Sequence, residues 1–291
     1  MNLPWLASVV RFTLLSGYLL AMGDLTFAAF PERPSVSTKP YRLGTLLVGL
    51  SLMVLASLLE FGVLVWNMAD GAWTQVGGDL LSGLFSTPRS TGTLLLIRVS
   101  AGLLVAAAAL LLRRRFPGIL LLLGGAGLTF LVSVDGHAGD EGWLAAPLAI
   151  DAVHALAAAV WLGGLAILWW RLPRLDEEDA LGKCQGFSRL ATVCFPLAVI
   201  SGVVNGWYHL KPDLTALWRQ PYGELLLAKT ALVLVVLGLA FHLRQILLPA
   251  WASDAGASCR MRNRMGLELV FGMGILALTA ILTQTSTTPM G

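Results

Sequence analysis

The sequence predicts an all-α integral membrane protein, and its composition and the pattern of its apolar residues lead to this class. Of the 291 residues, 56% are hydrophobic and only 13% are charged, and the mean hydropathy is +0.75. In a soluble domain about 25% of the residues carry a charge. The apolar residues here form long runs with short polar breaks, as transmembrane helices do. We therefore expect a single polytopic membrane domain over residues 1–291.

About eight apolar runs reach or approach the ~20 residues that cross the core of a bilayer. They cover residues 5–30, 43–66, 91–112, 117–135, 147–170, 188–208, 222–247 and 265–284. The first run has no basic residue before it and is longer than the apolar part of a signal peptide, so we expect it to be a helix of the protein. Between the runs, 74–85 is predicted to be an amphipathic surface helix and 171–187 a solvated linker.

The basic residues predict how the chain is oriented. Most of them follow the first, third, fifth and seventh runs, namely Arg33, Lys39, Arg42, Arg113, Arg114, Arg115, Arg171, Arg174, Lys183, Arg189, Arg244, Arg260, Arg262 and Arg264. Loops rich in Lys and Arg face the cytoplasm. This places both termini on the outer, periplasmic side, and it accounts for the net charge of +3 without any binding to nucleic acid.

A candidate metal site follows the fourth run. Asp151 and His154 are three residues apart and share one helix face, and ionisable groups in a membrane helix indicate a functional site. His137, between flanking glycines, is tethered at the same outer face by a short loop. Imidazole and carboxylate groups together bind divalent and transition metals. His137, Asp151 and His154 are therefore predicted to be metal ligands.

Other residues are weaker candidates for this site. His209, at the outer end of the sixth run, could add a fourth ligand, and Met68 at the outer edge could offer a soft ligand to Cu(I). Glu60 is a third accessory candidate. The cysteines show no CxxC spacing, so we expect Cys184, Cys194 and Cys259 to be reduced and structural.

Several charged side chains share one predicted depth. Counting 1.5 Å per helical residue from the outer ends puts Arg11, Glu60, Arg98, His154 and Lys229 roughly 9 to 10 Å inside the membrane. Such groups turn away from lipid, which predicts a polar vestibule open to the outside. Arg11, Arg98 and Lys229 are interpreted either as ion pairs that fix the helix register or as a gate.

The chain also resembles the copper resistance protein D (CopD) family over residues of about 130–288. The resemblance is carried, in order, by Gly-His-Ala at 136–138, Asp-Ala-Val-His-Ala-Leu-Ala-Ala-Ala-Val-Trp-Leu-Gly-Gly-Leu at 151–165, Phe-Ser-Arg-Leu-Ala at 187–191, Ser-Gly-Val-Val-Asn-Gly-Trp at 201–207, Tyr-Gly-Glu-Leu-Leu-Leu-Ala-Lys at 222–229 and Gly-Leu-Glu-Leu-Val-Phe-Gly at 266–272.

This resemblance implies an eight-helix membrane domain for copper transport or homeostasis in the bacterial inner membrane. It also implies that His137, Asp151 and His154 bind a copper ion, as Cu(I) or Cu(II). A separate periplasmic copper-binding protein of the CopC type is the expected partner, beside the lipid bilayer.

Two other functions stay open. His137 and His154 could be the axial pair of a haem in an electron-transfer protein, although a second, inner pair is missing because only His242 lies on the other side. A permease for a small anionic solute would use Arg11, Arg98 and Lys229 instead. The chain has no Walker A motif and no GxGxxG unit, and we expect no enzymatic activity.

Overall fold

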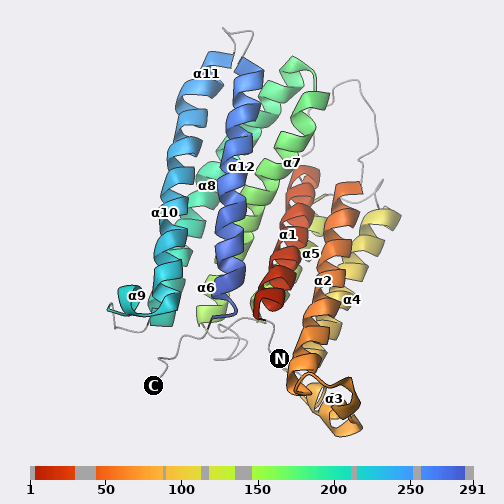
Figure 1. Cartoon of the computed structure of the whole chain (residues 1–291). Helices are drawn as coiled ribbons and strands as arrows, with labels where there is room; N and C mark the ends of the chain where they lie inside the picture. The colour runs from red at the N-terminus through yellow and green to blue at the C-terminus, as the bar shows by residue number, and fades with distance from the viewer. Residues whose placement is uncertain are drawn as a thin grey trace. The chain divides into compact units, whose positions relative to one another are not determined.

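The computed structural model describes residues 4–29, 44–87, 90–112, 118–134, 146–210, 215–251 and 257–285, and within these ranges the regular structure is entirely helical. The chain divides into two compact units, Met1–Ala152 and Val153–Gly291. The boundary between them falls inside helix α6, which runs from Ala146 to Ala158. Figure 1 shows the course of the chain.

The first unit is built on four long helices. They are α1 (Pro4–Ala29), α2 (Gly44–Met68), α4 (Thr91–Leu112) and α5 (Gly118–Val134). Helix α1 packs against α2 and α5, and α4 packs against the same two helices. The four helices therefore form a closed ring, so that each presents one face to a shared interior.

Glycine allows α1 and α2 to pack closely. A methyl group at Gly17 would lie 2.6 Å from the carbonyl oxygen of Gly49, and one at Gly49 would lie 2.7 Å from the backbone nitrogen of Ala21. Small residues at such crossings bring helix backbones together in membranes, where packing rather than the hydrophobic effect drives association. Near the same crossing, Asp24 of α1 is fully buried and accepts a hydrogen bond of 3.1 Å from the backbone N–H of Leu46 in the first turn of α2.

The loop after α2 contains two short helices where one was expected over 74–85. A 3₁₀ turn covers Trp73–Gln75, and α3 covers Gly78–Leu84. The rings of Trp66 and Trp73 lie 5.2 Å apart, and Leu84 is buried. Val76 and Gly77 separate the two pieces, and glycine disfavours a continuous helix.

The second unit contains the end of α6 and the remaining helices. Its elements are a π-helical segment (Ala159–Gly163), α7 (Gly164–Arg171), a 3₁₀ turn (Leu172–Arg174), α8 (Glu177–Leu210), α9 (Ala216–Arg219), α10 (Pro221–His242), a second π-helical segment (Leu243–Leu247), α11 (Leu248–Ala250) and α12 (Ala257–Leu282). Helix α12 packs against α10 and α7, and α7 packs against α8. Most of the basic residues of this unit lie at the end of α7, in the 3₁₀ turn that follows it, in the first part of α8, in the second π-helical segment and at the start of α12.

The predicted linker 171–187 is wrong over most of its length. Helix α8 begins at Glu177, about eleven residues before the predicted span. Its first turn is acidic, and the Asp176 carboxylate accepts a hydrogen bond of 3.0 Å from the backbone N–H of Asp179. An Asp cap and acidic residues at a helix start stabilise its unpaired N–H groups and its dipole. The polar residues of this segment keep it out of the predicted bilayer span, but they do not prevent it from forming the first turns of α8.

The prediction of an all-α membrane protein is confirmed. Seven helices in the described ranges are long and apolar enough to cross a membrane, and the apolar helix α5 is shorter. Large apolar side chains face outward, among them Leu104, Leu111, Val203 and Val270. Charged side chains are instead buried, as at Arg11, Asp24, Arg98 and Glu268. Charges inside and apolar groups outside are what lipid requires.

Candidate functional site

His154 of α6 is held by helix α8. Its Nδ1 lies 2.7 Å from the carbonyl oxygen of Ala198 and 3.4 Å from the hydroxyl oxygen of Ser201. Because a carbonyl oxygen only accepts hydrogen bonds, Nδ1 is the nitrogen that carries the proton. In the neutral ring the lone pair then belongs to Nε2. Histidine ligands of metals are commonly oriented in this way, through a hydrogen bond from the second ring nitrogen to a carbonyl.

Gly202 makes room for the imidazole ring of His154. A methyl group at this position would lie 2.9 Å from Cε1 and 3.2 Å from Nδ1, and carbon atoms pack no closer than about 3.5 Å without repulsion. The absence of a side chain at Gly202 therefore lets α8 approach α6 close enough for the bond from Nδ1 to Ala198. Ser201 and Gly202 stand side by side in the Ser-Gly-Val-Val-Asn-Gly-Trp stretch.

The other predicted ligands are described only in part. Asp151 lies three residues before His154 on α6 and is half-buried. His137 lies outside the described residues, as does the side chain of His209. Met68 is exposed at the C-terminal end of α2. Within the described ranges, no three His, Cys, Asp or Glu side chains come together as a metal-binding group.

In the first unit, three of the predicted charged residues meet. Nη1 of Arg11 lies 3.3 Å from Oε1 of Glu60, and Nη2 of Arg98 lies 2.9 Å from Oε2 of the same carboxylate. Arg11 also donates a hydrogen bond of 3.4 Å to the carbonyl oxygen of Val132. The three charges come from α1, α2 and α4, and Val132 from α5, so this charged cluster joins all four helices of the ring. Lys229 lies on α10 in the second unit.

The charged cluster bears on the accessory role of Glu60. Both of its carboxylate oxygens accept hydrogen bonds from guanidinium groups, and its side chain is 27% exposed. A metal ion at Glu60 would have to displace an arginine and would meet two positive charges nearby. The geometry thus favours an ion-pair role for this residue.

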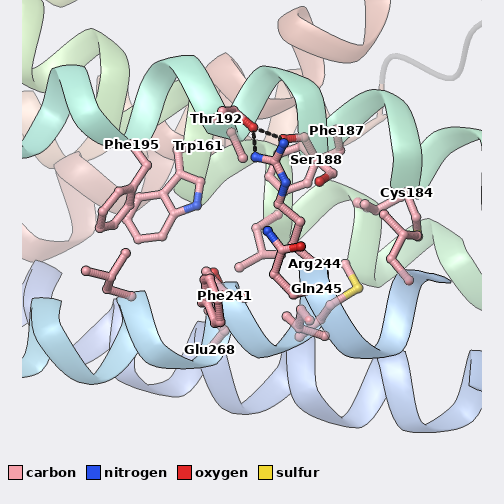
Figure 2. A pocket seen from close by; sticks show the side chains of 18 of the residues that line it. Trp161, Cys184, Phe187, Ser188, Thr192, Phe195, Phe241, Arg244, Gln245 and Glu268 are labelled. Atoms are coloured by element: carbon pink, nitrogen blue, oxygen red, sulfur yellow. Dashed lines mark hydrogen bonds between the residues drawn. The ribbon is translucent and has the colours of Figure 1, made fainter. Parts of the chain in front are cut away.

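Beyond His154, a π-helical segment changes the course of the helix. Residues Ala159–Gly163 are all buried, and within them Trp161 meets Phe195 of α8 edge to face, with ring centroids 5.0 Å apart. Single π-helical turns inside α-helices are frequently found at functional sites. A cavity of about 260 Å³ begins at these two rings and is lined by residues of α7, α8, α10 and α12 (Figure 2).

Some of these features could not be expected from the sequence alone. The Ser-Gly pair at 201–202 stood out only as part of the family resemblance, because its contact with His154 depends on how α6 and α8 are aligned. Of the cavity residues, Met261 and Met265 are spaced i, i+4, which places them on one face of a helix. This spacing was the sequence signal that the two side chains lie near each other.

These features define a class: a polytopic helical membrane protein with buried charges and a histidine held by a hydrogen bond to the neighbouring helix. The family model for the copper resistance protein D-like N-terminal domain matches residues 1–146, and the model for copper resistance protein D matches residues 181–282. The first match extends the likeness to the residues before about 130, where none of the sequence motifs above lies.

Individual relatives agree with the family models. Copper resistance protein D of Pseudomonas syringae pv. tomato is 30% identical, over 94% of this chain and 94% of that protein. Copper transport protein CutJ of Bacillus subtilis (strain 168) is 27% identical, over 56% of this chain and 30% of that protein. Inner membrane protein YebZ of Escherichia coli (strain K12) is 29% identical, over 57% of this chain and 58% of that protein. No solved structure matches the chain.

The chain belongs to the copper resistance protein D family. It is a multi-pass protein of the bacterial inner membrane. Of the three relatives, two are named for copper and one for the membrane in which it resides.

Proposed function

We propose that this protein carries copper across the bacterial inner membrane and binds it first at an outer-side site formed by His137, Asp151 and His154. Family membership supports copper as the cargo, because relatives are named for copper resistance and copper transport. The proposal includes no chemical conversion of a substrate.

The orientation of His154 is the observation that carries the proposed site. The bond from Nδ1 to the carbonyl oxygen of Ala198 fixes the tautomer in which Nε2 has the lone pair, and a neutral imidazole binds metal through that lone pair. Asp151, one helical turn earlier, adds a carboxylate, and His137 adds a second imidazole from the preceding loop. Two imidazoles and a carboxylate suit Cu(II), and sulfur ligands favour Cu(I).

The charged cluster is proposed as a brace for the first unit. Both guanidinium groups pair with the same carboxylate, so separating α1, α2 and α4 would break two ion pairs in the interior of the unit. Lys229 is proposed as a gating charge in the second unit. Met68 and His209 are proposed as accessory outer ligands, and a CopC-type periplasmic protein as the donor of copper.

Copper binding by purified protein tests the proposed site. Elemental analysis of wild type should show copper that is lost in His154→Ala, while His242→Ala should retain it because His242 lies in the last turn of α10. An absorption spectrum of the same samples should be free of haem bands. Equal copper in wild type and His154→Ala would refute the site, and haem bands would refute the copper function in favour of electron transfer.

A further inference from the structure

The cavity of the second unit has an interior that is mostly apolar and aromatic, with a few polar groups at defined places. Phe187, Phe195 and Phe241 contribute rings, and Arg244 and Glu268 contribute charges (Figure 2). The cavity lies toward the end of the unit where α8 and α12 begin, which is rich in basic residues. The positive-inside rule assigns this end to the cytoplasm.

Glu268 is the residue of the cavity that indicates a bound proton or cation. Its side chain lines the cavity, and the residue is only 2% exposed. Among the described residues, it makes no hydrogen bond or ion pair. A carboxylate removed from water and left without a partner is costly, and the cost is relieved by a proton or by a cation.

Three sulfur-containing side chains line the same cavity. Cys184 of α8 is a free thiol and is buried, and Met261 and Met265 of α12 are buried too. All three residues line the cavity. Met261, Met265 and Glu268 follow the spacing i, i+4, i+7, which puts them on one face of α12.

We infer that this cavity is a second metal site, which binds Cu(I) through the thiolate of Cys184 and the thioethers of Met261 and Met265, with Glu268 supplying negative charge beside the ion. Thiolate and thioether groups are the soft ligands that select Cu(I). The inference rests on the proposed function, because it takes copper to be the cargo. It adds a station on the cytoplasmic side that the His/Asp site does not include.

The charges in the cavity are compatible with a bound cation. When the bond between copper and sulfur forms, the thiol of Cys184 loses its proton to solvent, and copper stays in the +1 state. Glu268 contributes a second negative charge. The guanidinium of Arg244 is exposed and donates a hydrogen bond to the hydroxyl of Thr192 on α8 (Figure 2). Arg244 therefore offsets part of the negative charge while its own charge remains in contact with water.

The position of the cavity fits an inner station. Trp161, which lines the cavity, follows His154 by seven residues, or about 10 Å along the helix. Trp161 and Phe195 both line the cavity, with ring centroids 5.0 Å apart, at the end nearer to the level of His154. The π-helical segment Ala159–Gly163 contains Trp161, so a change in that turn would move one of the two rings.

The test uses the full chain in detergent, under reducing conditions and with His154→Ala as background, so that copper at the outer site does not contribute. Cu(I) is added with a competing chelator, and X-ray absorption identifies the atoms bound to it. We expect one Cu(I) per chain with sulfur neighbours. Cys184→Ser should weaken the affinity at least tenfold, and Met265→Leu should weaken it while preserving the volume of the side chain.

Cys194→Ser and Met273→Leu are the matched controls, since neither residue lines the cavity, and both should bind Cu(I) as the background protein does. Thermal unfolding of each variant shows whether the bundle is intact. Equal affinity of the Cys184→Ser and Cys194→Ser variants, or copper bound by nitrogen and oxygen alone, would overturn the inference. Failure of the outer site is separate, because it would show as equal copper uptake by wild type and His154→Ala.

Discussion

Replacing Gly202 with alanine should weaken copper binding without removing any proposed ligand. The new methyl group would lie 2.9 Å from Cε1 of His154, so the ring must retreat by at least about 0.5 Å to restore ordinary contact. A retreat of that size stretches the 2.7 Å bond between Nδ1 and the oxygen of Ala198 to the limit of about 3.2 Å for a hydrogen bond. Loss of such an orienting bond typically costs 10- to 100-fold in metal affinity.

The assay is a copper titration of purified protein against a competing chelator, with Gly206→Ala as the control. Gly206 lies one turn further along α8, and a methyl group there would meet only Leu226, at an ordinary distance of 3.5 Å. We expect a 10- to 100-fold weaker affinity for Gly202→Ala and an unchanged one for Gly206→Ala. If Gly202→Ala binds copper as tightly as wild type, or if both variants lose affinity equally, the proposed role of His154 is wrong.

Three predictions concern the stability of the first unit, measured by thermal or denaturant unfolding of the purified protein. Glu60→Ala removes the carboxylate that two buried arginines share and should cost about 3–5 kcal/mol; wild-type stability would contradict the bracing role of the charged cluster. Gly49→Ala forces the backbones of α1 and α2 apart and should cost about 1–3 kcal/mol, whereas Gly62→Ala meets no atom within 4 Å and should not destabilise. Asp24→Ala removes the acceptor for the first turn of α2 and should cost about 1–3 kcal/mol; an unchanged midpoint would show that the contact with Leu46 is unimportant.

The apolar spans could be predicted because the thickness and apolar character of the bilayer core set the length and composition of a helix that crosses it. The helices of the first unit begin and end within a few residues of the expected runs. Helix α8 was predicted too short, because hydropathy detects where a helix meets lipid and not where its backbone hydrogen bonds end. The Asp176 cap and the acidic residues that follow it were the sequence signal for the true start.

Contacts between helices were harder to predict. A shared depth indicated that Arg11, Glu60 and Arg98 could meet, but only the ring of α1, α2, α4 and α5 shows that they do. The support of His154 by Ala198 and Gly202 depends on the alignment of α6 with α8, which no spacing within one helix reveals. The sulfur atoms around the cavity were assigned to packing or overlooked for the same reason.

Copper flux through the protein in sealed vesicles is the most direct test of the account. Purified wild type and His154→Ala are reconstituted into liposomes that contain a fluorescent copper indicator, and copper is added outside. The account predicts copper entry with wild type well above protein-free liposomes, and a rate near that background with His154→Ala. Entry at the background rate with correctly folded wild type, or equal rates for the two proteins, would contradict it.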